Sequence, residues 1–361
     1  MTEQSKLTKS YDQTHYRLSH HGERNVSVLK QVIDQLDGEQ SSDIYGNGEV
    51  IEQFQEKMTG ILGKEAAVFF PSGTMAQQIA LRIWSDRKQG ATVGYHPLSH
   101  LEIHEEGGLK ELHHIYPILL GNKERLITLE DIQAVEEPLA CILIELPQRE
   151  IGGQLPTFEE LQAISGYCKA KGIKLHLDGA RLWECLPYYD KTAEEICALF
   201  DSVYVSFYKG IGGIAGAILA GEAEFIEESK IWKRRHGGDL ISLYPYIVTA
   251  DYYYEQRIGS MPDYVQAAKK VAELFNQCSN TKTVPKIPVA NMFHVHFSKT
   301  IADMEQVFAE VQEKSDVGFT LMLWEEAEGV SAFELSIGES FLTIPEENLK
   351  IAFDTLKTAM N

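Results

Sequence analysis

Three short segments carry residues that could do chemistry, and each lies where a strand is expected to end. The first is a glycine-rich loop that begins at Lys209, between two predicted strands. Gly210 and Gly212 match the first two glycines of the dinucleotide fingerprint, but Ala215 takes the place of the third, and that fingerprint must join a strand to a helix. A nicotinamide-dependent oxidoreductase therefore stays only as an alternative. Small residues after a strand let a ligand approach closely and leave Lys209 facing a cleft, unless it is an ordinary solvated lysine.

The second segment, HLDGAR, places a carboxylate and a guanidinium together at the end of another predicted strand. Asp178 is the last residue of that strand, and Arg181 follows after Gly179 and Ala180. Ligands of open α/β sheets bind outside the carboxyl ends of the strands, so this pair could hold a cation and an anion side by side. The alternative is structural, with Asp178 capping a following helix and Arg181 pairing with it.

The third segment is PSGT, in which a predicted strand passes into a predicted helix. Ser72, Gly73 and Thr74 would offer hydroxyl and backbone N–H groups there, which is a typical site for a phosphate group. An ordinary Ser/Thr helix cap has the same sequence. Together, however, the three segments offer a lysine for a Schiff base, an aspartate for a pyridinium nitrogen and a helix N-terminus for a phosphate. These are the parts that a pyridoxal 5′-phosphate (PLP) site needs.

The order of these segments resembles the threonine aldolase / β-eliminating lyase family of fold-type I PLP enzymes. PSGT, HLDGAR and SFYKG follow one another as in that family, and the likeness extends to the stretch 42–76, to HLEIHEEGG from His100 and to the glycine pair 152–153. It covers most of residues 15–240. The resemblance implies a PLP-dependent carbon–carbon lyase that cleaves a β-hydroxy-α-amino acid to glycine and an aldehyde, as low-specificity threonine aldolase does. β-Elimination or transamination of another amine, and PLP binding without turnover, remain as alternatives.

The resemblance also implies roles for individual residues. Lys209 would form the Schiff base, Asp178 would pair with the pyridine nitrogen, Arg181 would contact the phenolic oxygen and His100 would stack on the ring. Lys209, His100 and Asp178 would be the catalytic residues. The phosphate would be held by residues of two subunits, namely Ser72, Gly73 and Thr74 with Tyr45 and Arg234 of a neighbouring subunit. A homodimer or homotetramer with shared active sites is therefore expected. No metal site is expected, because HLEIH does not match HExxH.

The chain departs from the family pattern on the substrate side. Ser19 lies in LSHHG, which replaces the family's arginine-serine-aspartate-threonine strand. Gln148 replaces a histidine near the substrate hydroxyl and cannot act as a base, and Glu334 takes the place of the arginine that binds the substrate carboxylate. A carboxylate there would repel the substrate's own on the order of a few kcal/mol. We therefore expect an altered carboxylate site, unless Arg149 or Arg24 takes over.

The composition excludes several classes of protein. The 361 residues include 33 Lys+Arg and 53 Asp+Glu, so the net charge of −20 would repel nucleic acid and anionic membranes. The hydrophobic share of 44% is enough for packed cores. We find neither a transmembrane stretch nor a signal peptide, and the five cysteines contain no CxxC. These features predict a cytoplasmic protein with buried reduced thiols, which acts on a small amino-acid-like molecule.

The segments PSGT, HLDGAR and the glycine-rich loop from Lys209 lie within a series of alternating strand-like and helix-like stretches. They predict an α/β fold, in which a mostly parallel PLP-transferase-type sheet has helices on both faces. Strands are expected at 66–71, 91–95, 114–119, 140–146 and 173–178, and helices at 73–84 and 157–170. Strands 202–207 and 216–221 should pair antiparallel or occupy different positions in the sheet, because the loop between them is too short for a crossover helix.

Three regions are expected along the chain. Residues 1–25 would form an N-terminal arm, 26–250 a large PLP-binding domain and 251–361 a small C-terminal α+β domain. The elements expected near and beyond that boundary are helices at 240–257, 263–277 and 345–360, with strands at 289–297, 319–324 and 332–337.

Overall fold

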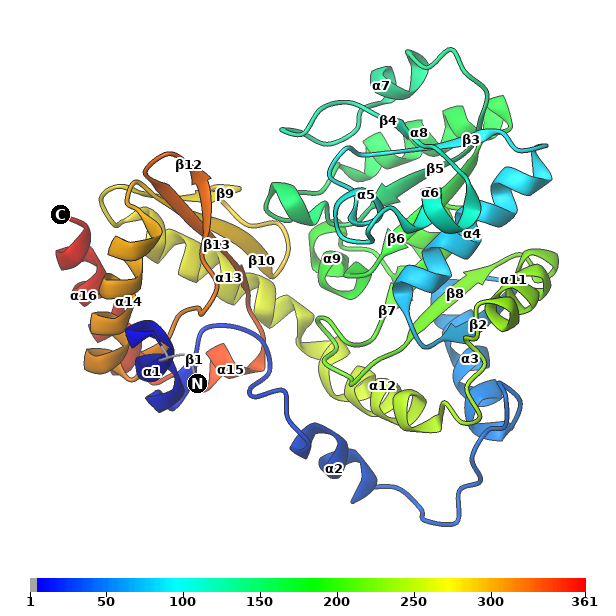
Figure 1. The fold of residues 1–361 in the computed structure, drawn as a ribbon. Coiled ribbons are helices and arrows are strands. Elements are labelled where there is room, and N and C mark those ends of the chain that lie inside the picture. The colour runs from blue at the N-terminus through cyan, green and yellow to red at the C-terminus, as the bar shows by residue number, and fades with distance from the viewer. Residues whose placement is uncertain (1–4) are drawn as a thin grey trace. The chain divides into compact units, whose positions relative to one another are not determined.

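The computed structural model describes residues 5–361, which divide into two compact units (Figure 1). The larger unit contains Asn25–Glu150 and Leu155–Gly259. The smaller contains the described residues up to Arg24, together with Ile151–Gln154 and Ser260–Asn361. Within residues 5–361, no helix has the length and apolar character needed to cross a membrane.

A seven-stranded sheet forms the centre of the larger unit. In spatial order its strands are β2 (Ala66–Phe70), β8 (Ala217–Gly221), β7 (Ser202–Ser206), β6 (Lys174–Gly179), β5 (Leu139–Glu145), β3 (Thr92–Tyr95) and β4 (Ile118–Leu119). The pairs from β7 to β4 are parallel, and β8 pairs antiparallel with both β7 and β2. The predicted α/β fold is confirmed, and of the two arrangements expected for the strands that flank the Lys209 loop, the structure has antiparallel pairing of β7 with β8.

Helices of the larger unit, among them α3 (Glu49–Leu62) and α4 (Gly73–Arg87), pack on both faces of this sheet. The helices of this unit are α2 (Ser27–Ile33), α3, α4, α5 (His100–Ile103), α6 (Gly108–His113), α7 (Leu129–Gln133), α8 (Phe158–Lys171), α9 (Leu182–Tyr189), α10 (Ala193–Cys197), α11 (Ala223–Arg235) and α12 (Tyr244–Arg257). Successive strand residues point to opposite faces. Phe70 accordingly packs in one core cluster with Trp84 of α4, whereas Phe69 meets Phe54 of α3 with ring centroids 6.0 Å apart. The apolar run of β5 is therefore buried from both sides, as parallel strands require.

The smaller unit is built on an antiparallel sheet with an aromatic core. Its strands, in spatial order, are β12 (Trp324–Ala327), β13 (Val330–Ser336), β10 (Met292–Phe297) and β9 (Thr281–Val284). Its helices are α1 (Lys6–Gln13), α13 (Met261–Asn276), α14 (Ile301–Ser315), α15 (Glu339–Leu342) and α16 (Glu346–Met360). Phe275 of α13 meets Phe297, Phe333 and Phe353 with centroids 6.2, 5.9 and 5.0 Å apart. This aromatic cluster joins α13, the sheet and α16 into one core.

The N-terminal segment belongs to the smaller unit and is not a separate arm. Ser10 of α1 donates to Gln312 Oε1 of α14 at 2.5 Å. Residues 16–17 form β1 (Tyr16–Arg17), which pairs in parallel with β11 (Val317–Gly318). The expected three-part division therefore differs from the observed one, because long-range hydrogen bonds tie the first residues to the C-terminal part of the chain.

Several predicted elements have other boundaries. The expected strand at 319–324 is wrong, because Phe319 turns into the aromatic core and β12 begins only at Trp324. The strand expected at 114–119 shrinks to β4, since His114 has a left-handed backbone with φ of 57°. Helix α14 and strand β9 were not predicted. All five cysteines are buried free thiols, as expected.

Candidate active site

The three segments singled out in the sequence all lie in the larger unit. Asp178 lies on β6, Lys209 lies in the loop between β7 and β8, and Ser72 precedes α4. The carboxyl ends of β6 and β7 point the same way, because these strands are parallel. The structure therefore places Asp178 and Lys209 at the same edge of the sheet, which is where ligands of open α/β sheets bind.

Asp178 is buried and held from two sides. Its Oδ2 accepts a hydrogen bond from Gln77 Nε2 at 2.6 Å, and its Oδ1 accepts one from the backbone N–H of Ala180 at 3.1 Å. Arg181, not Asp178, occupies the N-cap position of α9. The helix-cap explanation for Asp178 therefore does not apply.

Lys209 is a partly buried amine. Among the described residues its Nζ has no hydrogen bond or ion pair, and it lies 5.8 Å from the centroid of the Tyr208 ring. Burial and the nearby Arg181 guanidinium lower the pKa of Lys209, against the opposing effects of Asp178 and Glu145. An amine that more readily loses its proton is a better nucleophile, which suits Schiff-base formation.

The start of α4 leaves polar groups uncommitted. Ser72 is the N-cap residue, with an extended backbone (φ −141°, ψ 135°), but its side chain makes no capping hydrogen bond. Gly73 and Thr74 are the first two helical residues. The ordinary capping explanation of PSGT therefore does not hold, and hydroxyl and N–H groups remain for an anion.

His100 opens the short helix α5 and belongs to a polar cluster. Its Nδ1 lies 3.0 Å from Glu105 Oε1, and Glu105 Oε2 accepts from Gln78 Nε2 at 2.8 Å. The His104 ring lies 5.1 Å from the His100 ring, but its Nε2 contacts Glu150 Oε1 at 2.8 Å. The two histidines therefore have different partners.

A second carboxyl group lies next to Asp178. Glu145 ends β5 directly opposite Asp178 in the β5–β6 register. Burial and the neighbouring charge of Asp178 raise the pKa of Glu145. Gln148 Nε2 donates to Glu145 Oε2 at 3.1 Å and to the Leu98 carbonyl at 3.2 Å, which fixes its amide group.

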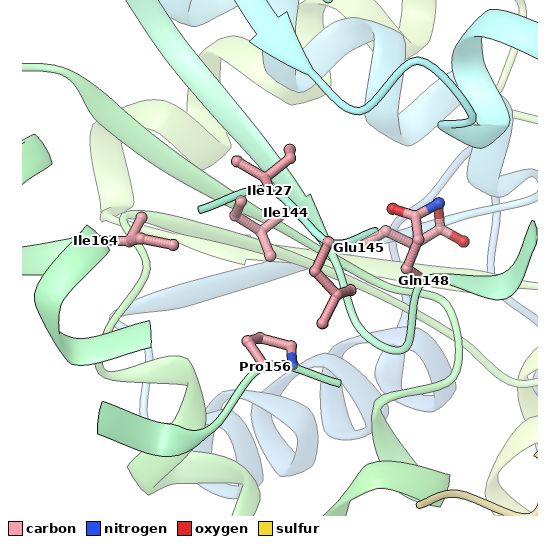
Figure 2. A pocket seen from close by; sticks show the side chains of 7 residues that line it. Ile127, Ile144, Glu145, Gln148, Pro156 and Ile164 are labelled. Atoms are coloured by element: carbon pink, nitrogen blue, oxygen red, sulfur yellow. The ribbon is translucent and has the colours of Figure 1, made fainter. Parts of the chain in front are cut away.

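Figure 2 shows Glu145 and Gln148 lying together beside a pocket that Ile127, Ile144 and Ile164 also line. The cavity volume of about 10 Å³ corresponds to roughly one water molecule. This pocket is therefore too small for a substrate, and its apolar walls explain why the Glu145 carboxyl is poorly solvated.

Tyr45 and Arg234 lie together at the surface of the larger unit. The Arg234 guanidinium stands over the Tyr45 ring, 4.9 Å from its centroid. Asp239 lies 4.0 Å from Arg234 and 2.9 Å from the buried Lys233. Tyr45 is 47% exposed, and the Arg234 side chain is 61% exposed. The structure therefore groups these two residues and leaves them accessible.

The four expected substrate residues are divided between the units. Gln148 and Arg149 lie in the larger unit, and Ser19 and Glu334 lie in the smaller one. Glu334 pairs with His294 across β13 and β10, with Oε2 3.8 Å from His294 Nε2. Ser19 is half-buried near Tyr11.

Sequence reasoning missed four polar residues, namely Gln77, Gln78 and Glu184, which are buried, and Glu145, which is half-buried. Glu145 could have been found, because it ends an apolar run at the same sheet edge as Asp178. Glu184 packs against Gly210, where a Cβ atom would lie 2.1 Å from Glu184 Oε1, so a larger residue after Lys209 would displace the Glu184 side chain. Burial raises the pKa of Glu184. The contact of Glu184 with Gly210 depends on the path of the loop between β7 and β8. No pattern in the sequence around Glu184 indicates that path.

Comparisons with known proteins agree with this geometry. A family model described as β-eliminating lyase matches residues 32–298. The low-specificity L-threonine aldolase 1 of Arabidopsis thaliana is 26% identical over 292 residues, which cover 78% of this chain and 79% of that relative. A solved structure from Listeria monocytogenes, provisionally named L-allo-threonine aldolase, is 60% identical with a TM-score of 0.97 and covers 98% of this chain and 99% of that one. Serine palmitoyltransferase of Sphingomonas wittichii is 13% identical with a TM-score of 0.66, covers 92% of this chain and 82% of that one, and is similar in fold alone.

Proposed function

This chain belongs to the β-eliminating lyase family, and from that premise we propose that it is a PLP-dependent lyase of the threonine aldolase type. It cleaves a β-hydroxy-α-amino acid to glycine and an aldehyde. The names of the Arabidopsis relative and the Listeria neighbour support threonine or allo-threonine as the substrate type. The observation that carries the proposal is the Lys209 amine, partly buried and without a hydrogen-bonding partner in residues 5–361, at the sheet edge where Asp178 lies.

The residues at this edge fit PLP. An amine without a hydrogen bond suits the aldehyde group, and a buried carboxylate with two N–H donors suits a protonated ring nitrogen. The uncapped start of α4 suits a dianionic phosphate, because helix N-termini carry partial positive charge. Each part of the cofactor therefore has a chemically matched group on this chain.

The proposed roles follow from these matches. Lys209 would hold the aldehyde carbon, Asp178 the ring nitrogen, Arg181 the phenolic oxygen and His100 one face of the ring. The phosphate would lie on Ser72, Gly73 and Thr74. When bound, PLP supplies an electron-accepting ring that stabilises negative charge at the substrate's α-carbon. Lys209, with its lowered pKa, is suited to exchange protons near neutral pH.

We also propose that two subunits share each site. Tyr45 and Arg234 are grouped and exposed on the larger unit, where they could reach the phosphate of a neighbouring subunit. Exposed apolar side chains lie beside Tyr45: Ile44 precedes it, and its backbone N–H donates to the carbonyl of Ile241, which lies in a segment that also exposes Leu240 and Tyr244. Such a patch is typical of a surface that another protein covers. The five buried free thiols support a cytoplasmic location.

The substrate-carboxylate site is altered in this proposal. Glu334 pairs with His294, so the place of the family's arginine carries a carboxylate with a histidine partner. Arg149 is a candidate replacement, since its backbone N–H and guanidinium are anchored by Glu145 and Glu150 at 3.3 and 2.9 Å. A bidentate guanidinium is the side chain best suited to bind a carboxylate.

A visible absorption spectrum of the purified protein, followed by borohydride reduction and peptide mass spectrometry, tests the cofactor assignment. We expect PLP covalently attached to Lys209 and absent from Lys209→Ala. Lys230→Ala, at an exposed lysine of α11 paired with Glu227 at 2.6 Å, is the matched control and should retain PLP. No PLP on the wild-type protein, even after PLP is supplied, would refute the proposal.

Product analysis separates the proposed reaction from its alternative. Incubation with L-threonine and L-allo-threonine should release acetaldehyde and glycine in equal amounts. A keto acid with ammonia would instead indicate β-elimination, which the family name also covers. PLP on Lys209 with neither set of products would reject the substrate type and leave the cofactor assignment intact.

A further inference from the structure

A chain of hydrogen bonds runs from helix α4 to His100 through a buried carboxyl group. Gln78 Nε2 donates to Glu105 Oε2 at 2.8 Å, and Glu105 Oε1 lies 3.0 Å from Nδ1 of His100. The Glu105 side chain is 1% exposed, whereas that of His100 is 33% exposed. The accessible end of this chain is therefore the imidazole ring, and the opposite end is an amide anchored on a long helix.

Glycine at position 108 makes this arrangement possible. A Cβ atom there would lie 2.4 Å from Gln78 Nε2, well inside van der Waals contact. Gly108 is the last residue of the HLEIHEEGG motif that begins at His100. Because Gly108 has no side chain, the Gln78 amide has room beside Glu105. The HLEIHEEGG motif and helix α4 therefore pack against each other beside the His100 ring.

The hydrogen bonds determine which nitrogen of His100 carries a proton. An ionised carboxylate can only accept, so Nδ1 must carry the hydrogen that Glu105 receives. In the neutral ring Nε2 is then unprotonated, and within residues 5–361 it has no hydrogen-bond partner. His104 differs, because its Nε2 is engaged by Glu150 and lies 3.4 Å from Arg149. By the same reasoning the lone pair of a neutral His104 lies on Nδ1, so the two neighbouring rings present opposite nitrogens, and Nε2 is the accepting nitrogen in His100 alone of the two.

We propose that Gln78, Glu105 and Gly108 are positioning residues that keep Nε2 of His100 available to accept the proton of the substrate's hydroxyl group. This inference rests on the proposed aldol cleavage. In that step the O–H bond breaks and its proton moves to Nε2, while the oxygen forms the aldehyde C=O. The Cα–Cβ bond breaks, and its electron pair stays with the α-carbon.

Gln148 cannot take this part in the reaction. Its amide nitrogen donates both to Glu145 and to the Leu98 carbonyl, and an amide is not a base at neutral pH. The histidine that the family has at this place is therefore not replaced in function by Gln148. His100 is the basic group whose orientation the structure explains.

The first test measures the tautomer of His100 in the full-length, PLP-loaded protein. Long-range ¹H–¹⁵N spectra of ¹⁵N-histidine-labelled protein distinguish the two tautomers, and His100→Asn assigns its signal among the 12 histidines. We expect the Nδ1–H form in the wild type and a loss of that preference in Glu105→Ala. A wild-type ring protonated on Nε2 would overturn the inference.

The second test compares two reactions of the same site. Cleavage of a β-hydroxy amino acid needs a hydroxyl-proton acceptor, whereas exchange of a glycine α-proton does not. We expect Glu105→Ala and Gly108→Ala to slow cleavage about tenfold or more, part of the roughly 10²–10⁴-fold that a positioned proton acceptor contributes. Glycine exchange should change less than about twofold on the same scale.

The control is Glu106→Gln, at the exposed neighbour of Glu105, which should leave both rates unchanged. Equal losses of cleavage and exchange in both variants would show a merely structural role and overturn the inference. A wild-type protein that neither cleaves nor exchanges would refute the proposed function, and the tautomer measurement would still decide the positioning of His100. Gly108→Ala keeps the test open if Glu105→Ala fails to fold, because it displaces only the flexible end of Gln78.

Discussion

Gln77 Nε2 lies 2.6 Å from Asp178 Oδ2, and this contact joins the first turns of helix α4 to the carboxyl end of strand β6. The next residue, Gln78, donates instead to Glu105. Adjacent side chains on a helix diverge by about 100°, so one helix can support two carboxylates on different sides. Helix α4 thus links the proposed phosphate site, the ring-nitrogen partner and the His100 cluster.

Gln77→Leu should weaken PLP binding about tenfold. The substitution preserves volume but leaves one oxygen of buried Asp178 without its donor, and a hydrogen bond to a charged group contributes roughly 1.5–3 kcal/mol. Titration of the cofactor-free protein with PLP measures the change in Kd. Gln162→Leu, at an exposed position of α8, is the matched control. An unchanged Kd for Gln77→Leu would mean that Asp178 needs no such support.

Mixing two inactive variants should restore activity if subunits share sites. Arg234→Ala removes the proposed contact to a neighbour's phosphate, and Lys209→Ala removes the lysine from its own subunit. In a randomly mixed dimer population, about a quarter of wild-type activity should return, because half the dimers combine one intact site with one doubly defective site. Activity is measured after joint unfolding and refolding of equal amounts. No recovery, with mixed dimers present by mass spectrometry, would argue that Arg234 serves its own subunit.

Glu334→Arg should improve cleavage of L-threonine or L-allo-threonine. The substitution replaces a carboxylate that would repel the substrate's carboxylate with a guanidinium that would attract it. The gain should appear mainly as a lower KM in a coupled acetaldehyde assay. Glu328→Arg, at an exposed position after β12, controls for the change in net charge. No change, or a loss, would place the carboxylate site elsewhere, with Arg149 as the next position to test.

His113→Phe should remove part of the protein's sensitivity to acid. Burial, reinforced by His236 and Arg82, lowers the pKa of His113 to about 4 from 6.5, and within residues 5–361 neither ring nitrogen makes a hydrogen bond. The unfolded chain binds a proton below pH 6.5, but the folded protein does so only near pH 4, so this histidine destabilises the fold increasingly as the pH falls through that window. The wild type should lose about 2 kcal/mol more than the variant between pH 7.5 and pH 5.

Urea unfolding at these two pH values measures the difference. His114→Asn serves as a control, since the His114 side chain is exposed and asparagine tolerates its left-handed backbone. Identical pH dependence of wild type and His113→Phe would mean that the folded protein accommodates a charged imidazolium at this position. The prediction concerns stability alone, because His113 lies outside the proposed chemistry.

Much of the larger unit could be predicted because its strands are short apolar runs with turn residues at their ends. The runs 140–146 and 173–178 gave strands within a few residues of β5 and β6, and the short loop after β7 left antiparallel pairing with β8 as one of two expected arrangements. The smaller unit was predicted less well. Phe319 carries a strand-like sequence but is drawn into an aromatic core with Phe275 and Phe353, where packing outweighs local preference.

The sequence by itself determined the candidate-site residues that belong to motifs, namely Ser72, Asp178 and Lys209, because each lies at or just after the end of a strand that is visible in the hydrophobic pattern. Only the tertiary structure decided what supports them. Glu145 becomes a neighbour of Asp178 through the register of β5 and β6, and Gln78 meets Glu105 because a glycine 30 positions later leaves room for its amide. Hydrogen bonds and burial depend on distances between segments far apart in the chain, and no local pattern of residues carries those distances.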